Sequence, residues 1–264
     1  MLRSIRKIYQ FFVDTPIKEG TVLNARYEVL SVIGKGSYGI TYLCKDLKTS
    51  DIRVIKQLRP SKRKNKKEVA LFENEIVVLK MLNHNNMPKL YDTFKVNSYV
   101  YYTMSYIEGD NLEEHIFFRR KIFKEREALL LLSRILNLVD YLHKQQISHG
   151  DLRIPNILIN ENEPFLIDFG LSNFSVSSTT SNQESFLEMK QQDYYDLGEI
   201  LLYLLYTSYS SKNKKALPWT EELTLTKETG NLLKRLLQMK EPYLTTANIL
   251  TDLHLALRAN EKMY

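Results

Sequence analysis

"ISHGDLRIPNILI", residues 147–159, combines an aspartate, Asp151, with a carboxamide, Asn156, five residues later. A second stretch, "LIDFG" at 166–170, places Asp168 at the end of an apolar strand. Any one of these residues can serve as a turn former, but the ordered set makes an oxygen-rich site. Mg²⁺ suits such a site, because it binds a few carboxylates together with substrate phosphates. The two stretches therefore predict a metal-assisted site that handles phosphate.

A glycine-rich turn, "GKGSYG" at 34–39, follows the first predicted strand. Its glycines, Gly34, Gly36 and Gly39, let the backbone approach phosphate oxygens without an intervening side chain. The residues after the turn continue as a strand and do not open a helix. A dinucleotide-binding fold needs a helix N-terminus under the pyrophosphate, so that interpretation is disfavoured.

Lys56 stands in an apolar strand centre, within "RVIK" at 53–56. Taken alone, it can be read as a lysine that extends outward from an edge strand. Glu75, however, lies on the inward side of a predicted helix, between Phe72 and Leu79, where a carboxylate without a partner is costly. An ion pair between Lys56 and Glu75 satisfies both groups.

The composition indicates a compact protein with 264 residues, 44% of them hydrophobic, enough for one large domain or two small ones. The formal charge of +6 favours anionic partners without choosing among them. One cysteine and five scattered histidines argue against a disulfide framework and a zinc site, and they fit a cytoplasmic location. The apolar runs are too short for a membrane-spanning helix, and no signal peptide is expected.

Residues 1–13 place apolar side chains on one helical face beside three basic residues. This stretch can lie on an acidic membrane or pack on the protein body. The second interpretation is favoured, because one short stripe with three positive charges binds lipid weakly.

Short alternating runs after residue 26 predict a five-stranded antiparallel sheet with one helix at 66–82. The later part is mostly helical, with helices expected at 124–146 and 193–207. Such a division predicts two lobes of unlike construction. The predicted strands are 26–33, 40–47, 51–58, 89–94 and 98–107, and the predicted parts of the chain are an N-terminal extension at 1–20, an N-lobe at 21–108 and a C-lobe at 109–264.

From residue 26 to residue 257, the chain resembles the eukaryotic-type (Hanks-type) Ser/Thr protein kinases, especially the short stand-alone kinases of bacteria. The glycine-rich turn, the strand lysine, the helix glutamate, the catalytic loop and the "DFG" occur in family order. The resemblance implies an α+β bilobal fold that binds ATP and Mg²⁺. It also implies a protein substrate with a Ser or Thr acceptor, and we expect no nucleic-acid partner.

The resemblance assigns roles to the residues of the two opening stretches. Asp151 would orient the attacking hydroxyl and accept its proton, and Asn156 and Asp168 would bind the metal ions. Arg153 would supply positive charge to the γ-phosphate, as a cation does at that position in Ser/Thr kinases. Lys56 would hold the α- and β-phosphates while Glu75 positions it. The implied nucleotide contacts are Ile33, Gly34, Gly36, Gly39, Val54, Lys56, Met104, Ser105, Ile107 and Leu158.

Two departures from the family pattern concern regulation. Gly150 replaces the arginine that grips a phosphorylated activation loop in many relatives, so we expect activity without loop phosphorylation. No proline occurs between 165 and 217, so the usual "APE" is missing and the peptide platform is in doubt. Asp196 resembles the aspartate that braces the catalytic loop. The hydroxyls that offer sites for autophosphorylation are Ser172, Ser175, Ser177, Ser178, Thr179, Thr180, Ser181 and Ser185.

Two other functional classes remain open. A kinase-like small-molecule phosphotransferase or ATPase also fits "HGDL", and the missing "APE" favours it. The complete glycine-rich turn and the full set of C-lobe helices favour a protein kinase instead. A pseudokinase that acts as a binding module is disfavoured, because every expected phosphate-binding and metal-binding residue is present.

Overall fold

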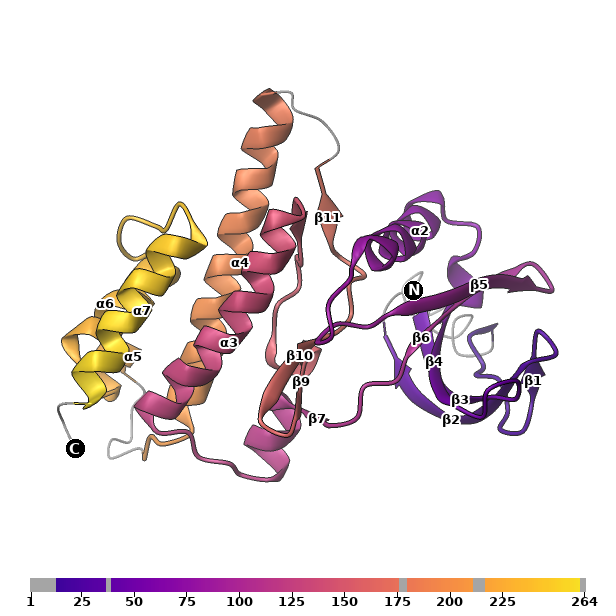
Figure 1. The fold of residues 1–264 in the computed structure, drawn as a ribbon, viewed down its shortest axis with the longest axis horizontal. Helices are drawn as coiled ribbons and strands as arrows, with labels where there is room; N and C mark the ends of the chain where they lie inside the picture. Colours follow the sequence, from indigo (N-terminus) through magenta and orange to yellow (C-terminus); the bar gives the residue numbers. More distant parts are fainter. Residues whose placement is uncertain (1–12, 37–38, 176–179, 211–216, 262–264) are drawn as a thin grey trace, which may run out of the picture. The chain divides into compact units, whose positions relative to one another are not determined.

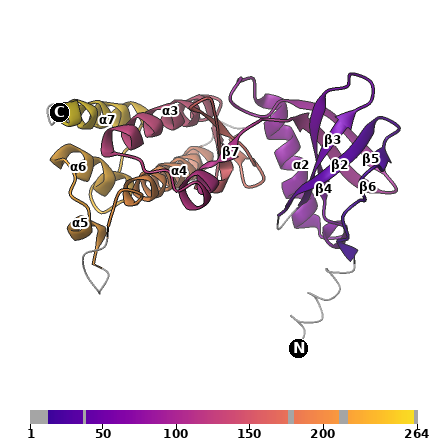
Figure 2. The same ribbon diagram turned by 90° about the horizontal axis from the view of Figure 1, so that it is seen from below.

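The structure, a computed structural model, describes residues 13–36, 39–175, 180–210 and 217–261 (Figures 1 and 2). The chain divides into two compact units, residues 1–107 and 108–264. Most of the predicted amphipathic stretch, residues 1–12, lies outside the described residues. None of the described helices is both long and apolar enough to span a membrane.

The first unit is built on a six-stranded antiparallel sheet in the order β1-β2-β3-β4-β6-β5, and its strands are labelled in Figure 1. Five of these strands are the predicted ones, and β1 adds a two-residue edge. The strands are β1 (Val22–Leu23), β2 (Tyr27–Lys35), β3 (Gly39–Asp46), β4 (Ile52–Leu58), β5 (Leu90–Val96) and β6 (Tyr99–Ser105).

Alternation along these strands builds a core on one face of the sheet. Tyr27 and Val29 of β2 are buried there beside Tyr42 and Cys44 of β3. Burial raises the pKa of the Cys44 thiol to about 12. The chain's single cysteine is therefore an apolar core residue, in keeping with the expectation that it forms no disulfide.

A short 3₁₀ turn, η1 (Pro60–Lys62), precedes the helix α2 (Lys66–Met81) of the first unit. The helix begins where the Asn65 side chain accepts a hydrogen bond from the backbone of Lys67. Phe72 is buried on its inner face, with its ring centroid 5.2 Å from that of Tyr102 on β6. The predicted helical spacing is therefore the spacing of a face that packs on the sheet.

The second unit is mainly helical, with short strands between its helices (Figure 1). The long helices α3 and α4 lie side by side, and α7 packs against α3. The helices are η2 (Glu114–Phe118), α3 (Glu125–Lys144), η3 (Ile154–Asn156), α4 (Thr180–Tyr206), α5 (Trp219–Glu222), α6 (Lys227–Leu236) and α7 (Thr246–Glu261). The strands are β7 (Asp110–Asn111), β8 (Ile147–Ser148), β9 (Ile157–Asn160), β10 (Glu163–Leu166) and β11 (Asn173–Phe174).

Helix α4 begins at Thr180, well before residue 193 where the apolar pattern predicts it. Its first turns come from the Ser/Thr-rich stretch at 172–185, whose composition predicts a loop, and that prediction is wrong from residue 180 onward. Phe186 explains part of the extension, because it is buried with its ring 6.2 Å from that of His143 on α3. No glycine or proline interrupts residues 180–197, so nothing in the sequence stops the helix.

Candidate active site

In the first unit, Lys56 and Glu75 form the predicted ion pair. Lys56 Nζ lies 2.8 Å from Glu75 Oε1 and 3.0 Å from Glu75 Oε2. Their side chains are only 11% and 4% exposed. Because β4 brings the lysine and α2 brings the glutamate, the pair ties the helix to the sheet. An ion pair this buried is costly to break by removing one partner.

The glycine-rich turn passes close to Lys56. A Cβ atom added to Gly39 would lie 3.2 Å from the Lys56 side chain and 3.0 Å from the Gln57 carbonyl oxygen. A Cβ at Gly34 would have ordinary contact with Thr41, at 3.5 Å. The turn therefore needs its last glycine for space above the lysine.

Two of the expected adenine contacts lie on the same sheet face as Lys56. Val54 is two residues before Lys56 on β4, and it pairs directly with Met104 on β6. Directly paired residues share a sheet face, as do residues two apart. Ile33 on β2 is 48% exposed. The Ser105 amide donates to the Lys89 carbonyl at 2.9 Å, so only the Ser105 carbonyl can serve adenine.

The last two expected adenine contacts are in separate units. Ile107 is the final residue of the first unit. Leu158 lies on β9 of the second unit, where it pairs with Asn111 of β7 and Phe165 of β10. Each residue has a defined backbone position within its own unit.

In the second unit, the catalytic loop brings Asp151, Arg153 and Asn156 together. Asn156 Nδ2 donates to the Asp151 backbone oxygen and to its Oδ2 atom, both at 2.9 Å. Arg153 Nε lies 3.1 Å from the same Oδ2. The Asp151 side chain remains 26% exposed, so the loop presents an oriented carboxylate to solvent.

A buried aspartate on α4 braces this loop, and it is Asp193 rather than the predicted Asp196. Asp193 accepts backbone hydrogen bonds from His149 at 3.0 Å and from Gly150 at 2.9 Å. His143 Nε2 lies 2.8 Å away and acts as a third donor, because a carboxylate can only accept. Asp193 is fully buried, so it depends on these donors.

Asp196, one turn further along α4, plays a lesser part. It accepts a hydrogen bond from Gln192 Nε2 at 2.8 Å and bonds the backbone of Leu152. Burial raises the pKa of Asp196 to about 6, and these hydrogen bonds only partly offset that shift. Both carboxylates face the catalytic loop, but only Asp193 fixes the residues just before Asp151.

Gly150, which stands in place of the usual arginine, has a left-handed backbone with φ +75. A Cβ atom there would lie 2.5 Å from the Leu171 carbonyl oxygen, closer than any side chain tolerates. The left-handed backbone therefore requires a glycine at this position, and the same glycine means that the usual arginine cation is absent. Ser172, which follows Leu171 beside Gly150, is 1% exposed, and its hydroxyl donates to the His149 carbonyl at 2.9 Å. Ser172 is thus a buried structural hydroxyl, contrary to its expected place among the autophosphorylation sites.

Asp168 occupies the left-handed region with φ 63, a conformation that aspartate adopts more readily than most residues. The next residue, Phe169, is fully buried with its ring 4.9 Å from that of His149. Burial lowers the pKa of His149, so its ring packs as a neutral group. The antiparallel strands β8 and β11 pair the chain just before the catalytic loop with the chain that follows the "DFG".

The oxygen atoms of this unit suit Mg²⁺ bound together with phosphates. The Asn156 amide nitrogen is committed to Asp151, which orients its Oδ1 atom as an acceptor. Within the described residues, no cluster of three His, Cys, Asp or Glu side chains can cage a metal alone. A carboxylate from Asp168 and a carboxamide from Asn156 therefore fit an ion that takes its other ligands from a nucleotide and water.

Comparison with known proteins identifies the family. A model described as the protein kinase domain matches residues 27–213. The chain belongs to the protein kinase family. It is 44% identical over 256 residues to the probable serine/threonine-protein kinase YbdM of Bacillus subtilis. The aligned residues are 97% of this chain and 99% of that relative.

Other relatives match a smaller part. Serine/threonine-protein kinase B of Synechocystis is 33% identical over 171 residues, which are 62% of this chain and 30% of the relative. Calcium-dependent protein kinase 4 of Plasmodium falciparum is 37% identical over 158 residues, 57% of this chain and 29% of the relative. These results confirm the predicted resemblance, the fold class and the assignment of the chain to an enzyme family that uses ATP.

The sequence did not predict three residues of this region. The sequence pattern does not distinguish Asp193 from Asp196, since both carboxylates occur in "DYYD". Arg59, which contacts the glycine-rich turn, and Asp14, which contacts Arg59, carry no pattern that marks them. One sequence signal points to Arg59: it directly follows β4, the strand that carries Lys56.

Proposed function

We propose that this protein transfers the γ-phosphate of ATP to Ser and Thr hydroxyls of protein substrates. The observation that carries the proposal is the catalytic loop, where Asn156 and Arg153 both contact one oxygen of Asp151. This arrangement leaves the carboxylate accessible and orients it. The family membership and the 44% identity to a serine/threonine-protein kinase support the same function.

Each charged residue has a role that follows from its chemistry. Asp151 positions the acceptor hydroxyl and takes its proton, and Arg153 balances charge on the γ-phosphate. Lys56, held by Glu75, binds the α- and β-phosphates. Asp168 and Asn156 would hold Mg²⁺, which would supply charge neutralisation at the phosphates when bound. These roles need a carboxylate that is oriented and a lysine that is already positioned.

The nucleotide base packs on apolar side chains in this proposal. Val54 and Met104, which pair directly on neighbouring strands, supply an apolar surface for it in the first unit. The backbones of Ser105 and Ile107 recognise the adenine edge, and Ile33 with the glycine-rich turn, Gly34, Gly36 and Gly39, covers the nucleotide. The proposed location is the cytoplasm, where reduced thiols and ATP are both present.

We further propose that activity does not require phosphorylation of the activation segment. Gly150 offers no cation to grip a phosphate, and its backbone conformation leaves no room for a side chain. Asp193 fixes the loop through the backbone instead. The catalytic loop is therefore held in place by contacts that a phosphate does not supply.

One observation favours a second candidate, a small-molecule phosphotransferase or ATPase. Residues 165–217 contain no proline, so the "APE" that normally ends the peptide-supporting segment is missing. The experiment is to incubate the purified chain with γ-labelled ATP and Mg²⁺, alone and with a basic protein acceptor. Labelled Ser or Thr supports the protein kinase. Phosphate release without protein labelling supports the alternative, and Asp151→Asn is the control for contaminating kinases.

A further inference from the structure

Arg59 contacts the backbone of the glycine-rich turn and is not among the expected nucleotide-binding residues. It follows β4 directly, three residues after Lys56. Its Nε atom donates to the Gly36 carbonyl at 2.7 Å, and one Nη atom donates to the Lys35 carbonyl at 3.4 Å. One rigid guanidinium therefore holds two consecutive carbonyls of the turn.

The other side of the same guanidinium is held by Asp14. Arg59 Nη1 lies 3.0 Å from Asp14 Oδ2. The carboxylate also accepts hydrogen bonds from the Ser61 backbone and hydroxyl, both at 2.8 Å. The Asp14 side chain is only 4% exposed, and Arg59 is 21% exposed. A carboxylate with three donors fixes the position of the arginine.

The segment that carries Asp14 is itself anchored to the sheet. The Ile17 amide donates to the Tyr42 hydroxyl at 3.2 Å, and that hydroxyl donates to Gln57 Oε1 at 2.8 Å. Gln57 follows Lys56 on β4, with its side chain on the opposite face. The part of the predicted extension after residue 13 is thus bonded to the strand that carries the phosphate-binding lysine.

We propose that Arg59 and Asp14 are positioning residues for the nucleotide, which they serve through the glycine-rich turn. The inference rests on the proposed function, since it assumes that this turn covers ATP phosphates. A turn rich in glycine has many conformations to lose when it closes on a ligand. By holding the carbonyls of Lys35 and Gly36, Arg59 keeps both oxygens away from anionic phosphates and restricts the turn before ATP binds.

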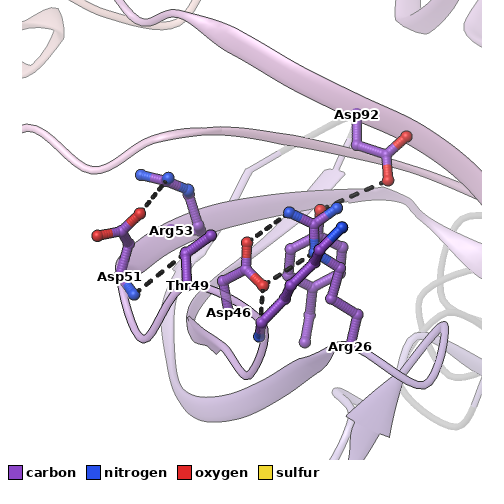
Figure 3. A network of polar contacts seen from close by, with 8 residues as sticks. Arg26, Asp46, Thr49, Asp51, Arg53 and Asp92 are labelled. Atoms are coloured by element: carbon purple, nitrogen blue, oxygen red, sulfur yellow. Dashed lines mark hydrogen bonds and ion pairs between the residues drawn. The ribbon is translucent and has the colours of Figure 1, made fainter.

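A second ion pair in the same unit provides a matched control (Figure 3). Arg26 donates to Asp46 through Nε at 2.9 Å and Nη2 at 2.6 Å. Asp46 is fully buried and Arg26 is 34% exposed. The burial of this pair is therefore similar to that of Asp14 and Arg59. Asp46 also accepts a hydrogen bond from the Lys48 amide, and no labelled residue of this network belongs to the described part of the glycine-rich turn. Loss of either pair costs stability, but only one pair bears on the nucleotide.

The experiment compares Arg59→Met and Asp14→Asn with Arg26→Met and Asp46→Asn. For each full-length variant, KM for ATP, kcat, the Kd of Mg²⁺-ATP and Tm are measured. We expect Arg59→Met to raise KM and Kd by about fivefold to thirtyfold, because that factor corresponds to the conformational entropy of ordering the backbone of one residue. The kcat should stay within about threefold of the wild-type value. Asp14→Asn shifts both in the same direction, and the double variant is little worse than Arg59→Met. Arg59→Lys restores part of the affinity, because it keeps the charge without the fork.

The controls decide between a positioning role and a purely structural one. Arg26→Met and Asp46→Asn are expected to lower Tm while leaving Kd and KM unchanged. Equal Kd values for Arg59→Met and Arg26→Met at similar Tm would overturn the inference. A wild-type chain that binds ATP without transferring phosphate would overturn the proposed function alone, and the Kd ratio would still decide the role of Arg59. A wild-type chain that binds no ATP would overturn both.

Discussion

The two units hold their charged residues in different ways. In the first unit, side chains far apart in sequence hold one another: Lys56 and Glu75 are 19 residues apart, and Arg59 and Asp14 are 45 apart. In the second unit, Asp151 bonds Asn156 only five residues away, and Asp193 holds the main chain beside it. Side-chain contacts between separate elements can be lost one at a time. A short loop whose residues bond one another, and whose main chain is held by one buried carboxylate, keeps or loses its geometry as a whole.

This difference separates two kinds of variant. Substitutions in the first unit should reduce nucleotide binding by graded amounts, because each removes one contact among several. Substitutions in the second unit should either remove the chemistry outright or change the stability of the loop. The five predictions below test that division, beginning with the largest effect.

The largest loss is expected for Asp151→Ala. Its carboxylate is the only proposed base, and a positioned base typically contributes about 10² to 10⁴ in rate, or roughly 3 to 5 kcal/mol. Single-turnover kinetics should show this loss in the chemical step, while the Kd of ATP changes little. Asp151→Asn keeps the size of the side chain and serves as the control for local packing. Retention of more than about a third of wild-type turnover would contradict the role.

Lys56→Met and Glu75→Gln should each lower kcat/KM by about tenfold to a hundredfold, since either change leaves a buried charge without its partner. The double variant should be little worse than the more damaging single change. Lys62→Met, which breaks an ion pair with Glu68 beside the same helix, is the control. Fully additive losses would show that the lysine and the glutamate act separately.

Gly150→Arg should destabilise the protein rather than make it responsive to phosphate. A side chain at φ +75 costs about 1 to 3 kcal/mol, and its Cβ would meet the Leu171 carbonyl. Gly150→Ala should lose a similar amount in chemical denaturation, because the Cβ atom causes the loss. If the arginine variant were as stable as the wild type and gained activity on phosphorylation, the backbone argument would fail.

Asp196→Asn should stabilise the protein at pH 7.5. The folded-state pKa of about 6 exceeds the ordinary value of 3.8, so the folded protein binds this proton more tightly. Its stability therefore falls as the pH rises from about 4 to 6, and the full penalty remains above pH 6. The substitution should recover about 1 to 2 kcal/mol there, a figure reduced for partial exposure, and nothing below about pH 4. Denaturation curves at several pH values test this, and a gain that is constant with pH would refute it.

The smallest effect is expected from the activation-segment hydroxyls. Replacing Ser175, Ser177, Ser178, Thr179, Thr180, Ser181 and Ser185 with alanine should change kcat by less than about tenfold, or roughly 1.4 kcal/mol. Ser172 is retained, because its buried hydroxyl holds the His149 carbonyl. Phosphatase treatment of the wild type should have a similarly small effect. A hundredfold loss that rephosphorylation restores would mean that another cation grips the phosphate.

The sequence predicts most of the first unit because its periodicities are strong. The helix expected at 66–82 is observed at Lys66–Met81, and its inward face holds Glu75 beside Lys56 as the spacing requires. The sequence does not predict the early start of α4, since the residues after 180 are polar as in a loop and the burial of Phe186 depends on its packing against α3. Local pattern therefore sufficed where one face was continuously apolar.

Within the site, the limit lies in contacts that depend on orientation. Asp193 and Asp196 are three residues apart on one helix, and only the direction of that helix relative to the loop shows which carboxylate meets the His149 and Gly150 amides. Arg59 and Asp14 are 45 residues apart with no intervening signal. The roles that the resemblance assigns to Lys56, Glu75, Asp151 and Asn156 remain predictions, although their geometry is compatible with those roles.

The buried thiol of Cys44 makes the protein convenient to label. Because its pKa is raised to about 12 and its side chain lies in the core of the first unit, the thiol should not react with alkylating dyes while that unit is folded. Because the chain has no other cysteine, a cysteine introduced at an exposed position becomes a unique attachment point for a spectroscopic probe. In the unmodified protein, dye incorporation at Cys44 instead reports each opening of the first unit.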